Sequence, residues 1–172
     1  GDSITQQDWP VFNENHIDEI VELSEELIKN TIDDVNNILK VTKIQTKKIY
    51  IYASATWKWN IFLSTLEQDE PNLKEMIESS LNNPEYSSFK KHIPKFCQNL
   101  FKELSSIDGD DKLRLLRVGM LSETEILKEL QSFYKINDGV DVILFSEDDS
   151  KIHDPKNRSN YSRPLRPAIF LE

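Results

Sequence analysis

The side chains best suited to binding a partner lie in the last ten residues, which read Arg-Pro-Leu-Arg-Pro-Ala-Ile-Phe-Leu-Glu from Arg163 to Glu172. The two guanidinium groups can pair with phosphates or carboxylates, and the two prolines stiffen the chain around them. A short apolar run and a final carboxylate follow, whereas a chain terminus is usually polar and frayed. The segment is therefore the last strand of a sheet, a rigid finger held out to a partner, or both.

The charge of this region differs from that of the whole chain. The 172 residues carry a formal net charge of −9, which argues against a domain that binds RNA or DNA through its overall charge. Residues 151–172 instead carry a local charge of 5 − 2 = +3, and a basic tail on an acidic body can present a positive surface. From charge alone, a solvated loop explains the tail equally well. The five basic side chains are Lys151, Lys156, Arg158, Arg163 and Arg166.

Catalytic chemistry finds little support in the sequence. Cys97 and His92 are five positions apart, so on a helix they need not share a face, and a cysteine on an apolar stripe is usually a core residue. The four glycines have no phosphate-binding spacing. The aspartates of 108–111 lack the spacing and the final glutamate of a calcium loop, and 147–149 is interpreted as an acidic cluster in a loop. We predict no catalytic residue and no metal site.

Three features of the sequence bear on the cellular compartment. The chain has one cysteine, no apolar run long enough to span a bilayer, and no signal-peptide pattern at residue 1. These features favour the cytosol and exclude an internal disulfide.

The elements that must position the tail are predicted from hydrophobic spacing. Apolar residues recur by threes and fours between Ile17 and Leu39, which predicts a helix from Asn15 to Val41 after an irregular start. β-Branched and aromatic runs predict three strands at 49–52, 140–145 and 168–171, with several short helices between the first two. We expect an α+β fold, in which a long amphipathic helix ends a helical bundle and a small domain follows with a short sheet of about three strands packed by helices.

The long helix has no predicted partner of similar length. We therefore expect its apolar residues Ile20, Leu27, Val35 and Ile38 to be more exposed than such side chains usually are. This interpretation divides the chain into residues 1–45, the end of a helical domain, and residues 46–172.

Aromatic residues and helix caps add local detail. Trp57 and Trp59 lie two apart on a helix and point in different directions, which favours core packing over a stacking surface. Tyr50 and Tyr52 share one strand face and are the better candidates for stacking on bases. The segment Ser-Glu-Thr-Glu at 122–125 predicts a capping box.

Several landmarks together resemble a known family. Trp9-Pro10 precedes the long acidic helix, a Lys-Ile-Tyr-Ile-Tyr strand leads to a Trp-Lys-Trp helix start, and the chain closes on Pro-Ala-Ile-Phe-Leu-Glu. The sequence is similar in these features to the C-terminal part of archaeal-type leucyl-tRNA synthetases, the form shared by archaea and the eukaryotic cytosol. The closing hexapeptide is the most specific match.

The resemblance implies that residues 1–45 end a helical domain of the anticodon-binding type and that residues 46–172 bind the long variable arm of leucine tRNA. It implies upstream synthetase domains as further partners, and neither DNA nor a membrane. ATP and magnesium would belong to an upstream catalytic domain, so this segment alone would hold no cofactor. The arginines and lysines would contact phosphates, and the terminal residues would contact unpaired bases, partly through the backbone. The predicted RNA-binding residues are Lys156, Arg158, Arg163, Arg166, Pro167, Ala168, Ile169, Phe170, Leu171 and Glu172.

Two other functions remain open at this point. The apolar tail could add a strand to a partner's sheet, which would make the chain a protein–protein interaction module. A small hydrolase built around Cys97 and His92 is the second alternative.

Overall fold

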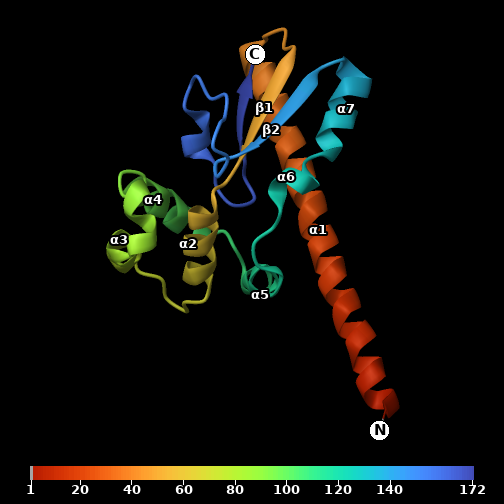
Figure 1. The fold of residues 1–172 in the computed structure, drawn as a ribbon, viewed down its shortest axis with the longest axis vertical. Helices are drawn as coiled ribbons and strands as arrows, with labels where there is room; N and C mark the ends of the chain where they lie inside the picture. Colours follow the sequence, from red (N-terminus) through yellow and green to blue (C-terminus); the bar gives the residue numbers. More distant parts are fainter. Residues whose placement is uncertain (1) are drawn as a thin grey trace.

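A computed structural model describes the backbone of residues 2–172 and the side chains of residues 17–172. The long helix α1 precedes the central strand β1, and six α-helices and one 3₁₀ helix follow before the chain returns to the sheet (Figure 1). The elements are α1 (Asp2–Thr42), β1 (Lys48–Ala53), α2 (Thr56–Leu66), α3 (Leu73–Asn82), the 3₁₀ helix η1 (Pro84–Phe89), α4 (Ile93–Leu104), α5 (Gly109–Val118), α6 (Glu123–Ile126), α7 (Glu129–Asp138), β2 (Asp141–Ser146), the 3₁₀ helix η2 (Arg158–Tyr161) and β3 (Ala168–Leu171).

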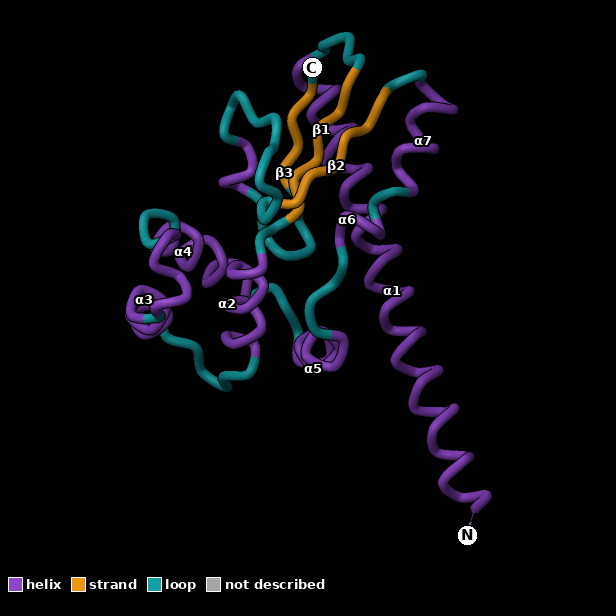
Figure 2. Tube along the Cα trace, viewed as in Figure 1, coloured by secondary structure: helices purple, strands orange, loops and turns teal. Residues whose placement is uncertain are grey.

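The three predicted strands form one sheet, as expected from the sequence. β1 lies in the centre, parallel to β2 and antiparallel to β3, so the order is β2-β1-β3 (Figure 2). Each strand has only four to six residues, and strands of this length need partners and a covered face to be stable. The C-terminal tail is therefore a strand of the sheet.

One face of the sheet packs into a hydrophobic core. Side chains from alternate positions of all three strands, such as Ile49, Val142 and Ile169, pack against α1 and against α6 and α7. Alternation along a strand sends the intervening residues to the opposite face. That face is aromatic: Tyr50 lies between Phe145 and Phe170, with ring centroids 6.3 Å and 5.8 Å away.

A second core lies among the helices α2–α5. Trp57 and Trp59 are both buried in it, which confirms the prediction of core packing. Leu23 of α1 belongs to this cluster, whereas Leu27, one turn further on, belongs to the sheet core. The long helix therefore contacts both cores.

The structure corrects two predictions for α1. Its backbone is helical from Asp2, so the prediction of an irregular start is wrong. A helix can extend beyond the residues that carry its apolar stripe. The expected exposure of the stripe is also wrong. Leu27 and Val35 are 1% and 0% exposed, and Ile20 and Ile38 are partly buried. The sheet and several short helices together cover these residues of α1. Among the apolar side chains of α1 that the structure describes, those near the two ends, Ile17, Val21 and Val41, are exposed.

The helix starts after α4 also differ from the sequence pattern. Ser122 makes no capping hydrogen bond, so the predicted capping box is absent, and the helix breaks into α6 and α7. Asp108, interpreted above as part of a loop, accepts a hydrogen bond from Asp111 N at 2.8 Å and caps α5. Between residues 2 and 172, no helix is long and apolar enough to cross a membrane.

Candidate functional site

The two arginines of the tail lie on a tight turn just before β3. Arg163 N donates to Arg166 O at 3.0 Å, and Arg166 N donates to Arg163 O at 2.8 Å. Pro164 occupies the first central position, which suits its fixed φ, while Leu165 has a φ of +68°, a conformation that glycine usually supplies. The turn places both arginines opposite each other.

A buried carboxylate holds this turn in place. Glu123 is 3% exposed, and it accepts hydrogen bonds from Leu165 N at 3.2 Å and from Trp59 Nε1 at 3.0 Å. Burial raises the pKa of the Glu123 carboxyl to about 7, although both hydrogen bonds oppose the rise. Glu123, the first residue of α6, thus links α2 to the tail.

The raised pKa predicts a pH dependence of stability. The folded chain binds the Glu123 proton more tightly than the unfolded chain does, so the free energy of unfolding should fall as pH rises from about 4.5 to about 7. The full change is about 3 kcal/mol. Urea unfolding of Glu123→Gln at several pH values should lack this component, while Glu125→Gln, a change at an exposed site on the same helix, should keep it. Parallel pH profiles for wild type and Glu123→Gln would contradict the assignment.

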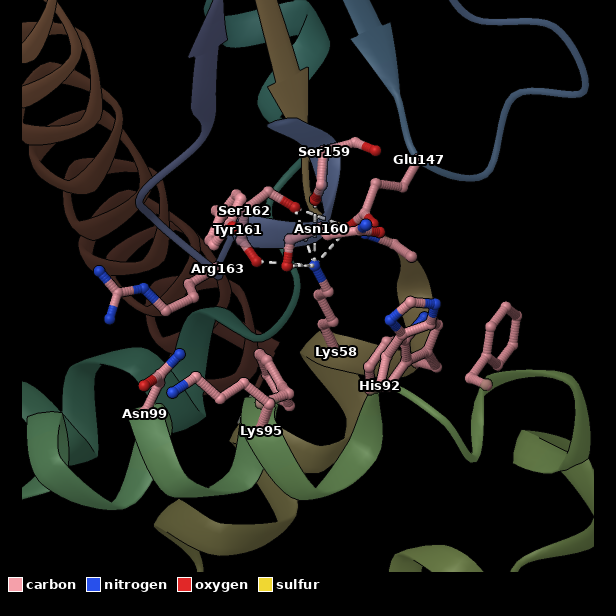
Figure 3. Close-up of a pocket in the computed structure, with 14 residues that line it drawn as sticks. Lys58, His92, Lys95, Asn99, Glu147, Ser159, Asn160, Tyr161, Ser162 and Arg163 are labelled. Atoms are coloured by element: carbon pink, nitrogen blue, oxygen red, sulfur yellow. Dashed lines mark hydrogen bonds and ion pairs between the residues drawn. The ribbon is translucent and has the colours of Figure 1, made fainter. Parts of the chain in front are cut away.

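A buried lysine fixes the long loop between β2 and β3. Lys58 of α2 is 2% exposed, and its ammonium lies 2.8 Å from Glu147 Oε1. The same ammonium donates to Ser162 O at 2.8 Å, to Ser162 Oγ at 3.1 Å and to Ser159 O at 3.3 Å (Figure 3). Burial lowers the pKa of Lys58, and the Glu147 carboxylate opposes that shift. Every partner of this ammonium lies in the loop, so Lys58 positions η2 and Arg163.

The acidic residues of the loop all make contacts within the protein. Glu147 also accepts from Ala55 N, and Asp148 accepts from Thr56 N and Oγ1, so these two cap α2 from a distance of over ninety residues in sequence. Asp149 accepts from Ser146 N, and Asp154 accepts from Arg158 N and from the Ser159 hydroxyl. Residues 147–149 lie in a loop, as predicted, and their carboxylates satisfy backbone donors.

The basic residues of the loop face solvent instead. Lys151, Lys156 and Arg158 are exposed, and within residues 17–172 none of them forms an ion pair. Arg163 pairs with Glu103, and Arg166 lies 3.4 Å from Asp34 on the surface. Surface pairs of this kind are weak and can exchange for a phosphate. The loop is thus electropositive on the outside.

Arg158, Arg163 and Arg166 line a shallow hollow of about 340 Å³, which we call the tail hollow. Its walls come from α1, η2 and the start of β3, and it brings together six of the ten residues predicted to bind RNA. The exposed Tyr161 lies at its edge. The lining residues are Asp34, Asn37, Ile38, Arg158, Tyr161, Arg163, Arg166, Pro167, Ala168 and Ile169.

The remaining predicted residues occupy different environments. The side chains of Ile169 and Leu171 are in the sheet core, so only their backbone faces outward. Phe170 is half-buried on the aromatic face of the sheet. Glu172 is exposed; its carboxylate lies 3.3 Å from His153 Nε2, and its backbone carbonyl accepts from Lys47 N and Lys48 N. Lys156 is exposed in the loop, away from the hollow's lining.

Neither Lys58 nor Tyr161 was predicted from the sequence to belong to this region. A lysine between two tryptophans in a core helix looks like a solvated position, and only the loop that folds over it makes it buried. Tyr161 lies in a polar segment without periodicity. Its exposure, 70%, is unusual for a tyrosine and becomes visible only in three dimensions.

The proposed cysteine–histidine chemistry is not supported by the geometry. Cys97 is fully buried in the helical core, and burial raises the pKa of its thiol to about 11. A nucleophilic cysteine needs a lowered pKa and access to substrate. Cys97 has neither, so it acts as a small core residue.

Comparison with known proteins identifies the chain. No protein-family model matches it. The leucine–tRNA ligase of Methanosarcina acetivorans is 37% identical over 99% of this chain and 18% of the relative's length. The corresponding enzymes of Methanocaldococcus jannaschii and Pyrococcus horikoshii are 29% and 27% identical, each over 95% of this chain and 16% and 15% of their own lengths.

The similarity thus extends over nearly the whole chain, while the chain spans less than a fifth of the relatives it matches. These relatives are leucine–tRNA ligases of archaea, in agreement with the family resemblance described above. The chain therefore corresponds to a C-terminal region of an archaeal-type leucyl-tRNA synthetase.

Proposed function

We propose that this chain is the tRNA-binding C-terminal part of a leucyl-tRNA synthetase and that it binds the long variable arm of leucine tRNA. The observation that carries the proposal is the division of charge in the loop between β2 and β3. Its carboxylates accept hydrogen bonds within the protein, while Lys151, Lys156 and Arg158 are exposed and the arginines line the tail hollow. A surface of this kind attracts a phosphate backbone even on an acidic chain.

The arginines of this surface suit the phosphates of an RNA, whereas the backbone of β3 and Phe170 suit its unpaired bases. Arg158 and Arg166 are placed to contact phosphates at the rim of the tail hollow. Unpaired bases can be read by hydrogen bonds at their edges and by stacking on their faces. By the alternation of an antiparallel pair, the amides and carbonyls of Ile169 and Leu171 point away from β1, toward the open side of β3. They offer such hydrogen bonds, and Phe170 offers a ring face.

The rest of the enzyme would supply the chemistry. In this proposal ATP, magnesium and leucine bind in upstream domains, which are the chain's partners together with the tRNA, and the protein acts in the cytosol. The 172 residues alone would have no aminoacylation activity. Residues 1–45 would connect to the helical domain, and residues 46–172 would hold the RNA.

The test is a comparison of arginine variants at several salt concentrations. Arg158→Gln and Arg166→Gln should each weaken binding to leucine tRNA and lower the slope of log K against log salt by roughly 0.7 to 0.9. Lys74→Gln, at an exposed site on the distant helix α3, is the matched control and should change neither. Fluorescence anisotropy with labelled leucine tRNA measures both quantities, and serine tRNA, which also has a long variable arm, tests specificity.

Salt-insensitive binding, or equal effects of all three variants, would count against phosphate contacts at this surface. A second function then becomes the better explanation. β3 is an edge strand with an open side, so it could accept a strand from a partner protein. In that case the binding partner would be a protein, and leucine tRNA would not compete for it.

A further inference from the structure

A second hollow lies beside the first, on the other side of Tyr161. It has a volume of about 440 Å³ and lies between α2, α4 and the loop that Lys58 holds (Figure 3). We call it the α4 hollow. Its volume falls within the range of sites that bind small organic molecules. Tyr161 and Arg163 line both hollows, so the two form one continuous surface.

One wall of the α4 hollow is aromatic. Trp57 and Phe89 are stacked at 5.3 Å between ring centroids, with 14° between the ring planes, and Phe96 meets Trp57 edge-on at 5.2 Å. Trp57 and Phe96 are both 6% exposed and Phe89 is partly buried. Packing against one another fixes these rings, so they form a rigid wall.

A neighbouring part of the lining, at α4 beside Phe96, is polar and positively charged. His92, Lys95 and Asn99 follow one another at helical spacing along the first turns of α4 and face the loop (Figure 3). Lys95 is exposed, and it has no ion pair with any residue from 17 to 172. Two further lysines, Lys90 and Lys91, directly precede His92 in the chain. This second basic group was not predicted from the sequence, because it lies more than fifty residues before the basic tail.

The floor of the hollow adds no net charge. Lys58 and Glu147 both line it, but each neutralises the other at 2.8 Å, and the ammonium is surrounded by loop carbonyls. The charge available to a ligand therefore comes mainly from Lys95, because Arg163 already pairs with Glu103. An aromatic wall, a nearby cation and an exposed tyrosine in the lining match a group with a flat ring and a phosphate.

We infer that the α4 hollow binds one unpaired nucleotide of an RNA that also occupies the tail hollow. The base lies between Tyr161 and the aromatic wall, and Lys95 contacts its phosphate. Stacking of bases on aromatic side chains tolerates any base, so the hollow would hold the nucleotide without selecting its identity. The inference rests on the proposed function and extends it to a second contact with the same RNA.

Tyr161 provides the sharpest test, because its side chain is exposed and its replacement should leave the fold intact. In the 172-residue chain, Tyr161→Ala should weaken binding to leucine tRNA by roughly 5- to 100-fold, whereas Tyr161→Phe should bind like wild type. Lys95→Gln should lower the salt slope by somewhat under one unit. Lys102→Gln, in the last turn of the same helix and outside the lining residues, is the control and should behave like wild type.

Photo-cross-linking locates the bound RNA directly, so the test does not rest on affinity measurements alone. Leucine tRNA carrying 4-thiouridine at unpaired positions should cross-link to Tyr161 or Trp57 on irradiation, as mapped by mass spectrometry. A millimolar concentration of AMP should compete only weakly. Competition by AMP as strong as that by tRNA would mean that the site serves a free nucleotide, and the RNA assignment would be wrong.

The two proposals can fail separately. If Tyr161→Ala binds as wild type and no cross-link forms, while Arg158→Gln and Arg166→Gln weaken binding, the α4 hollow is not an RNA site but the proposed function stands. If none of these variants affects binding, both proposals are overturned.

Discussion

Replacing Lys58 by methionine is expected to lower the free energy of unfolding by about 3–5 kcal/mol. The change would leave the Glu147 carboxylate buried without its cation and would remove the donor shared by the carbonyls of Ser159 and Ser162. Losing one partner of a buried ion pair costs more than the pair itself contributes, because the remaining charge stays desolvated. Urea unfolding followed by circular dichroism at pH 7 measures the loss.

The double variant Lys58→Met/Glu147→Gln separates the two causes. It should recover part of the stability, since it leaves no uncompensated charge, and Lys74→Met on the surface of α3 should change stability by less than about 0.5 kcal/mol. A single variant as stable as the surface control would show that Lys58 does not hold the loop. At temperatures where Lys58→Met is still folded, we expect weaker tRNA binding, because η2 and Arg163 lose their fixed position.

Removal of Phe170, Leu171 and Glu172 should destabilise the chain by on the order of 4 kcal/mol. Leu171 is 9% exposed in the sheet core, and the Glu172 backbone closes the sheet through three hydrogen bonds to residues 47 and 48. The truncation therefore tests the fold as much as recognition, and circular dichroism of the truncated chain should show loss of the cooperative transition at 37 °C or a large drop in its midpoint.

Side-chain variants test recognition with the strand retained. Phe170→Leu keeps an apolar residue on the sheet but removes the ring, and Glu172→Gln removes the carboxylate that lies beside His153 while keeping the backbone. If the terminus contacts bases, either change should weaken binding to leucine tRNA at unchanged stability. A truncated chain that folds and binds as wild type would contradict both roles of β3.

Much of the architecture could be predicted from local patterns. The runs around Tyr50, Ile143 and Ile169 are β-branched and aromatic, and short strands of that composition bury one face wherever they pair. The apolar spacing of α1 likewise predicted the helix, although its apolar residues were expected to be exposed and are covered. The family resemblance followed from the Tyr-Ile-Tyr, Trp-Lys-Trp and C-terminal segments, which the archaeal relatives confirm.

The sequence by itself determined where the strands and most helices lie, because hydrophobic period and strand propensity depend on neighbours within a few residues. Only the tertiary structure decided what covers α1, that Lys58 is buried, that Glu123 links α2 to the tail, and that Glu147 and Asp148 cap α2. Each of these depends on contacts between residues tens of positions apart. The type of a polar residue does not show whether its side chain is solvated or buried. The charge pattern of the proposed binding surface also depends on the tertiary structure. The loop is electropositive on the outside because its carboxylates accept hydrogen bonds within the protein.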